Sequence, residues 1–200
     1  MFKHIAEELS IALLRNNIID MEKRECYIYG LESAIPKIFL YTFILITALL
    51  TNSLLISAVF IFCYISLRQY TGGYHCKTAE MCLLLSFLIY LFVLLIYRFQ
   101  WGFTNVFIMI LSLFSVVVIL LMSPIESSNK PLESMEKKKY RILSIVFSLL
   151  FLMVAFVFYI LEFRGLQYVV SCSLVADAIL MLISVERRKK HEESVSEDDC

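Results

Sequence analysis

The feature that most constrains this chain is an uncharged apolar run from Ile38 to Leu67. The run is 30 residues long. At a rise of about 1.5 Å per residue, one helix of that length would reach roughly 45 Å. The hydrocarbon core of a bilayer is only about 30 Å thick, and about 20 residues cross it. Two short membrane spans joined by a tight turn at Thr51-Asn52-Ser53 therefore fit better than one long helix.

Four further apolar runs each have the length of one membrane span. They are Met81–Tyr97, Thr104–Met122, Ile142–Leu161 and Gly165–Val185. With 60% apolar residues and a mean hydropathy of +0.79, the chain is too apolar for a soluble domain of 200 residues. The sequence predicts an all-α, polytopic membrane protein with about six transmembrane helices.

The positions of Lys and Arg predict the orientation of these spans. With six spans and a cytoplasmic N-terminus, 16 of the 18 basic residues lie on the cytoplasmic side, and only Arg98 and Arg164 lie outside. One long helix over residues 38–67 would split them 11 to 7 at best. Because basic residues concentrate in cytoplasmic segments, we expect six spans with both termini in the cytoplasm.

By composition the whole chain divides into three parts. No internal repeat is apparent in the sequence. Residues 1–34 form a cytoplasmic amphipathic region, and no cleavable signal peptide is expected there. Residues 35–185 hold the six spans, so that 1–185 is a single membrane domain, and 186–200 form a charged cytoplasmic tail. The apolar residues at helical spacing in the first part are Phe2, Ile5, Leu9, Ala12 and Leu13.

A segment with reactive side chains, "RQYTGGYHCKTAEMC" (residues 68–82), separates two of the apolar runs. His75 and Cys82 are seven positions apart, which places them on one face if the stretch is helical. A thiol becomes a good nucleophile when an imidazole accepts its proton. Gly72 and Gly73 would let the backbone bend and bring N–H groups close to a substrate carbonyl. A Cys/His pair of this kind could perform acyl transfer.

Other interpretations of this segment remain open from the spacing alone. Cysteines are common in apolar helices, and an isolated histidine in a loop usually has no chemical role, so a structural role is the commoner outcome. A zinc site on His75, Cys76 and Cys82 would lack an evident fourth ligand. A non-enzymatic peptide transporter or membrane scaffold is the alternative from another class of protein. A transporter would need a polar path between spans, for which Asp177 and scattered Ser and Thr residues are the only candidates.

The segment 68–82 resembles the signature of the accessory gene regulator B (AgrB) family of membrane cysteine endopeptidases, Arg-x-x-x-Gly-Gly-x-His followed by a Cys. A second stretch, "SPIESSNKPLESMEKKKYR" (123–141), resembles the family's Pro…Asn-Lys-Pro segment with its basic run. The resemblance implies that Cys82 is the nucleophile and His75 its base. Two positions depart from the family pattern, because Ser123 and Cys76 stand where Ala is usual.

The resemblance also implies a function and a location. An AgrB-like enzyme of the bacterial cell membrane cleaves the acidic C-terminal tail from an AgrD-like propeptide. It then closes the remainder into a thiolactone or lactone, which is a quorum-sensing signal precursor. We expect a homodimer in the lipid bilayer, with no cofactor, no metal and no nucleic-acid partner. The candidate substrate-binding residues are Arg68, Gly72, Gly73, Lys130, Lys137, Lys138 and Lys139, although the three consecutive lysines are more simply explained as a topology determinant beside anionic lipid.

Asp177 is an ionisable residue inside the last apolar run. It lies eight positions before Val185, the last residue of the run. At helical rise, eight positions place Asp177 about 12 Å from the inner surface. A carboxylate at that depth is costly and suggests a function. It could orient His75 or form a hydrogen bond to another helix, and we favour the second because nothing in the sequence brings it beside segment 68–82.

Overall fold

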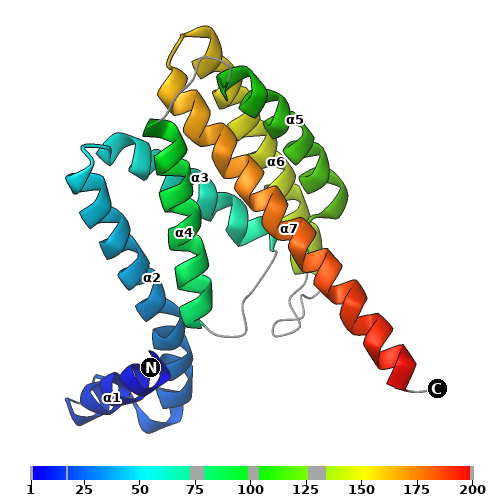
Figure 1. Cartoon of the computed structure of the whole chain (residues 1–200). Coiled ribbons are helices and arrows are strands. Elements are labelled where there is room, and N and C mark those ends of the chain that lie inside the picture. The colour runs from blue at the N-terminus through cyan, green and yellow to red at the C-terminus, as the bar shows by residue number, and fades with distance from the viewer. Residues whose placement is uncertain (1, 17, 73–78, 99–103, 126–133, 199–200) are drawn as a thin grey trace. The chain divides into compact units, whose positions relative to one another are not determined.

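The computed structural model describes residues 2–16, 18–72, 79–98, 104–125 and 134–198. These residues are almost entirely helical (Figure 1). The helices are α1 (Phe2–Arg15), the 3-10 turn η1 (Met21–Lys23), α2 (Arg24–Leu50), α3 (Leu54–Thr71), α4 (Ala79–Arg98), α5 (Thr104–Met122), α6 (Ser134–Ile160) and α7 (Arg164–Asp198).

The lengths and compositions of these helices confirm the predicted all-α membrane fold. Within the described residues, five helices (α2, α3, α4, α6 and α7) are long and apolar enough to cross a bilayer, and α5 contributes a shorter apolar helix. Large apolar side chains on their outer faces, such as Leu50, Phe62 and Leu121, are exposed, as lipid-facing residues are. The number of spans and the cytoplasmic location of both termini stay predictions.

The long apolar run from Ile38 to Leu67 is divided between two helices at the turn that the sequence predicts. α2 ends at Leu50 and α3 begins at Leu54. Asn52 has a positive φ of 51°, a conformation that Asn tolerates better than most residues. The Thr51 hydroxyl donates a 2.7 Å hydrogen bond to the Thr47 carbonyl and so binds the last turn of α2. The predicted turn at residues 51–53 is confirmed.

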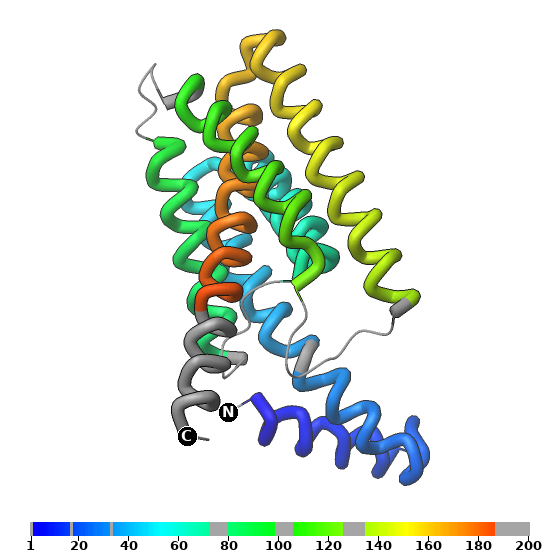
Figure 2. Tube along the Cα trace, turned by 90° about the vertical axis from the view of Figure 1, so that its right-hand side faces the viewer, coloured from blue at the N-terminus to red at the C-terminus, as the bar shows by residue number. Residues whose placement is uncertain are grey.

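The amphipathic start of the chain forms α1. Phe2, Ala6 and Ser10, one turn apart, are buried, and the first two pack with Ile35 of α2 in a small apolar cluster. Figure 2 shows α1 lying across the beginning of α2. α2 itself starts at Arg24 and continues through Pro36, so residues 34 and 35, where composition changes, lie within one helix.

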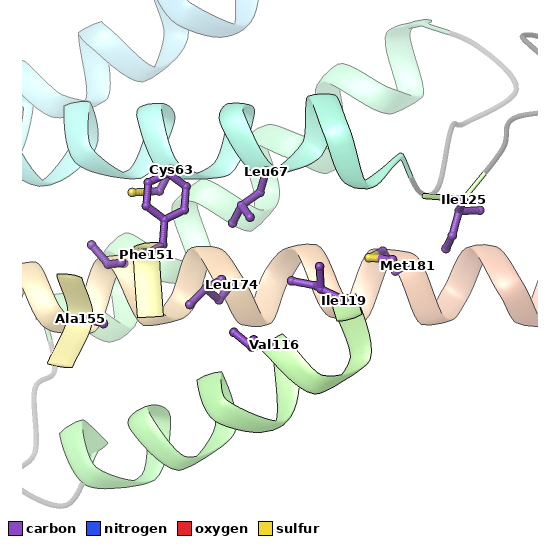
Figure 3. Close-up of a cluster of buried hydrophobic side chains, with 10 residues drawn as sticks. Cys63, Leu67, Val116, Ile119, Ile125, Phe151, Ala155, Leu174 and Met181 are labelled. Carbon is purple, nitrogen blue, oxygen red and sulfur yellow. The ribbon is translucent and has the colours of Figure 1, made fainter. Parts of the chain in front are cut away.

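The chain forms two compact units. The first contains residues 1–52 with 76–90, and the second contains residues 53–75 with 91–200. In the second unit α7 packs against α3, α5 and α6. Figure 3 shows its core, in which Leu67 of α3 and Val116 and Ile119 of α5 surround Leu174 of α7. The central position of α7 explains why 67% of its most apolar window is buried, far more than in the other spans.

Candidate functional site

Cys82 lies in the first turn of α4, within the first compact unit. It is half-buried and takes part in no disulfide. The first turn of a helix has backbone N–H groups without intrahelical acceptors and the positive end of the helix dipole, and both stabilise a nearby anion. The thiolate, not the thiol, is the nucleophilic form of cysteine. The local structure around Cys82 therefore suits the role that the sequence predicts for it.

The other described cysteines differ from Cys82 in exposure. Cys63 on α3 and Cys172 on α7 are buried in the second unit, while Cys26 on α2 is exposed. A buried thiol surrounded by apolar side chains is chemically inert. Of the described cysteines, only Cys26 and Cys82 are accessible to a substrate or reagent, and only Cys82 belongs to the signature.

Several predicted site residues lie outside the described residues. These are His75, Cys76, Gly73 and Lys130. The placement of His75 and Cys82 on one face therefore stays a prediction. Within the described parts of the chain, no three His, Cys, Asp or Glu side chains come close enough to hold a metal ion.

Arg68 and Gly72 lie at the C-terminal end of α3, in the second unit. The Arg68 guanidinium carbon is 5.8 Å from the centroid of the Tyr64 ring, one turn earlier, within the range of a cation–π contact. Gly72 ends the helix with φ 72° and ψ −138°, a conformation that is essentially restricted to glycine. The helix can only end in this way because Gly72 has no side chain.

Gly72 also forms an isolated parallel bridge with Ile125, which follows the end of α5. The backbone N–H of Ile125 donates a 2.9 Å hydrogen bond to the Thr71 carbonyl. A Cβ atom at Gly72 would collide with the Ile125 carbonyl oxygen. The two stretches that carry the family resemblance, 68–82 and 123–141, are thus joined by main-chain contacts, which sequence analysis did not predict.

Tyr70 connects the same helix end to α6. Its ring stacks on Phe147, with centroids 5.3 Å apart and an angle of 8°, and meets Tyr140 edge-on at 6.0 Å. Lys137, Lys138 and Lys139 are exposed in the first turns of α6, just before Tyr140. Tyr70 therefore packs the end of α3 against α6, the helix whose first turns carry these lysines.

Asp177 lies on α7 and is completely buried. Neither carboxylate oxygen has a hydrogen bond of normal geometry within the described residues. Its electrostatic neighbours are the Thr71 hydroxyl and the Arg68 guanidinium, both on the last turn of α3. Asp177 thus lies near the start of the signature segment, while the hydrogen bond to another helix that we favoured stays a prediction.

Thr71 and Ile125 are the residues of this region that sequence analysis missed. The Thr71 hydroxyl donates to the Leu67 carbonyl at 3.0 Å and is fully buried, while its carbonyl accepts from Ile125. Neither residue type indicates a site by itself. The available signal was the pair of opposite charges: Arg68 at the predicted cytoplasmic end of one apolar run and Asp177 inside another.

Comparison with known families assigns the chain. The sequence profile of accessory gene regulator B, AgrB, matches residues 4–185. The chain belongs to the AgrB family. The match covers every described helix from α1 to the apolar part of α7, so both compact units are part of the AgrB fold.

Two AgrB-like proteins of Clostridium perfringens are similar to this AgrB-family chain. The one from strain 13 is 30% identical over 143 residues, which cover 68% of this chain and 65% of the relative. The one from strain SM101 is 28% identical over 144 residues, with the same coverage. The matched region thus spans slightly less than two thirds of the length of each relative. No solved structure matches the chain significantly.

Proposed function

We propose that this AgrB-family protein is a membrane-embedded cysteine endopeptidase that processes an AgrD-like, autoinducing propeptide. The observation that carries the proposal is the family match over residues 4–185, which includes the signature with Cys82 in the first turn of a membrane helix. The protein would cleave the acidic C-terminal tail of the propeptide and close the remainder into a ring. A homodimer, which the family resemblance implies, remains a prediction.

The first step is acyl transfer to the enzyme. The Cys82 thiolate attacks the scissile carbonyl carbon, and a C–S bond forms. The tetrahedral intermediate then collapses, the C–N bond breaks, and His75 donates the proton that the departing amine of the tail needs. The N-terminal part of the propeptide is left as a thioester on Cys82.

The second step forms the ring. A thiol or hydroxyl within the bound propeptide attacks the thioester carbonyl, forms the new thioester or ester bond and releases the Cys82 thiolate, while His75 accepts the attacking group's proton. Holding that group beside the carbonyl provides an effective concentration on the order of 10⁵ M or more. Water must be excluded, because hydrolysis would discard the activation that the thioester retains. A site at the membrane surface, surrounded by apolar helices, suits this requirement.

The exposed lysines at the start of α6 support recognition of the substrate. Lys137, Lys138 and Lys139 are three consecutive exposed positive charges, and the propeptide tail is expected to be acidic. Exposed pairs of opposite charge attract weakly and depend on ionic strength. Such contacts suit recruitment of the tail better than the chemical step.

Cleavage of the propeptide by purified, lipid-reconstituted protein tests the function. We expect Cys82→Ser and His75→Ala each to abolish cleavage while membrane insertion is retained, and Cys76→Ala to keep most of the activity. Activity in Cys82→Ala together with its loss in Cys76→Ala would contradict the choice of nucleophile. A transporter or scaffold would leave the propeptide uncut with every variant, including the unmodified protein.

A further inference from the structure

One face of α6 carries a row of aromatic side chains that packs against α3. Tyr140, Phe147 and Phe151 lie at positions i, i+7 and i+11 of the helix, so they share one face. Tyr70 of α3 meets the rings of Tyr140 and Phe147 at centroid distances of 6.0 and 5.3 Å. Phe62, earlier on α3, meets Phe151 at 6.0 Å, and Figure 3 shows Phe151 pointing toward α3. Apolar contacts of this kind are not directional, so by themselves they tolerate a rotation or a slide of α6.

Ser144 lies within this aromatic row and adds a hydrogen bond to it. It follows Tyr140 by four positions, precedes Phe147 by three and is fully buried. Its hydroxyl accepts a 2.6 Å hydrogen bond from the buried hydroxyl of Ser123 and donates a 2.9 Å hydrogen bond to the Arg141 carbonyl. Ser123 directly follows α5, so the pair joins the end of α5 to α6. A directional polar contact within an apolar helix interface can fix the register of the helices.

The Ser123–Ser144 pair also closes a ring of contacts around the end of α3. Two residues after Ser123, the Ile125 amide donates a 2.9 Å hydrogen bond to the Thr71 carbonyl. Thr71 is adjacent to Tyr70, whose ring packs on α6, the helix of Ser144. The ends of α3 and α5 and the first turns of α6 are therefore held to one another, and loss of the serine contact should loosen the hydrogen bond at Ile125.

The helix ends joined in this way carry candidate substrate-binding residues. Gly72 ends α3, and the three consecutive lysines at 137–139 lie in the first turns of α6. A change in the register of α6 by one position would turn each lysine by about 100° around the helix axis. The direction in which the lysines present their charges thus depends on the contact that Ser144 makes.

We propose that Ser123 and Ser144 are positioning residues for substrate recognition. Their hydrogen bond fixes the register of α6 against α3 and α5, and so directs the three lysines toward the acidic tail of the propeptide. Neither serine touches the substrate. The inference rests on the proposed function, which assigns the lysines to the propeptide tail, whereas the effect of the serine pair on the helix ends can be measured without any substrate.

The first measurement is hydrogen exchange at the Ile125 amide in the full-length, detergent-solubilised protein. We expect Ser144→Ala to accelerate this exchange by about threefold to tenfold, as for the loss of one hydrogen bond between membrane helices. Ser148→Ala is the matched control, because Ser148 is equally buried on α6 and donates to the Ile145 carbonyl of its own helix. The control should leave exchange at Ile125 unchanged. Unchanged exchange in Ser144→Ala, or equal acceleration in both variants, would overturn the proposal.

A double variant separates the serine pair from its individual side chains. Ser144→Ala leaves the Ser123 hydroxyl buried without its acceptor, whereas Ser123→Ala/Ser144→Ala removes both partners. Because the two changes disrupt one interaction, exchange at Ile125 in the double variant should be no faster than in Ser144→Ala alone. Multiplicative acceleration in the double variant would show that the two serines act separately, which would contradict a shared role.

The second measurement is the kinetics of propeptide cleavage. We expect Ser144→Ala to raise KM by about threefold with kcat changed less than about twofold, because it displaces weak, exposed charge pairs and not the reacting groups. In a background with the three lysines replaced by Gln, the same change should leave KM unaltered, because the charges that it displaces are absent. A rise in KM in both backgrounds, or a fall in kcat at constant KM, would overturn the proposal. If the unmodified protein cleaves nothing, the proposed function fails, and the exchange experiments still decide whether the serine pair holds the helix ends.

Discussion

Gly72 and Ile125 approach so closely that a side chain at Gly72 would collide with the Ile125 carbonyl oxygen. The positive φ of Gly72 adds a second reason for glycine at this position. The contact joins two stretches that are separated in the sequence by the whole of α4 and α5. Its geometry gives a direct test of whether the bridge matters for activity.

Gly72→Ala should destabilise the protein and abolish cleavage. Strain in this backbone region costs about 1–3 kcal/mol, and the collision adds to it. We expect a lower Tm in detergent and loss of activity. Gly30→Ala is the control, because Gly30 lies within α2 and a Cβ there would meet no atom within 4 Å. That change should leave activity intact and stabilise the helix by roughly 0.5–1 kcal/mol. Equal activity of the two variants would show that the bridge is dispensable.

Replacement of Lys137, Lys138 and Lys139 by Gln should weaken propeptide binding more than turnover. We expect KM to rise by about threefold to tenfold at low salt, as for weak exposed ion pairs, with kcat little changed. The difference between variant and unmodified protein should shrink at high salt, because charges are screened over about 8 Å already at physiological ionic strength. Lysines in the first turns of a helix oppose its dipole, so the change should not destabilise α6. An unaltered KM would remove these lysines from substrate recognition.

The six-span orientation predicts which positions face the cell exterior. Single cysteines at Asn52, in the turn between α2 and α3, and at Arg164, at the start of α7, should react with a membrane-impermeant maleimide in whole cells. A single cysteine at Ser128 should react only after permeabilisation. The background should have all six native cysteines replaced, because any remaining thiol could react with the maleimide in place of the introduced one. Labelling at Ser128 from outside the cell would contradict the six-span orientation.

The fold was predictable where a local length or pattern determines it. The break at residues 51–53 follows from the length of one apolar run, and the amphipathic α1 follows from its spacing. The start of α2 at Arg24 was not predictable in this way. A helix continues through Pro36 when packing compensates the lost hydrogen bond, and composition does not report that packing.

The candidate site was predictable only in part, for a related reason. The nucleophile, its base and the basic run are contiguous in sequence and match a family signature. The proximity of Asp177 to Arg68 and Thr71, and the bridge between Gly72 and Ile125, bring together residues far apart in the chain. Such contacts depend on which helices are neighbours, and hydrophobic periodicity alone does not determine that.

Detection of a covalent acyl-enzyme tests the central claim most directly. A propeptide whose ring-forming residue is replaced by Ala can be cleaved but not cyclised, so the thioester should accumulate. Mass analysis of the peptide that contains Cys82 should then show an increase equal to the N-terminal part of the propeptide. The increase should be absent in His75→Ala and should disappear on treatment with hydroxylamine, which cleaves thioesters. Full-rate release of a linear acid from this propeptide, with no adduct on Cys82 at any time, would contradict the acyl-enzyme mechanism.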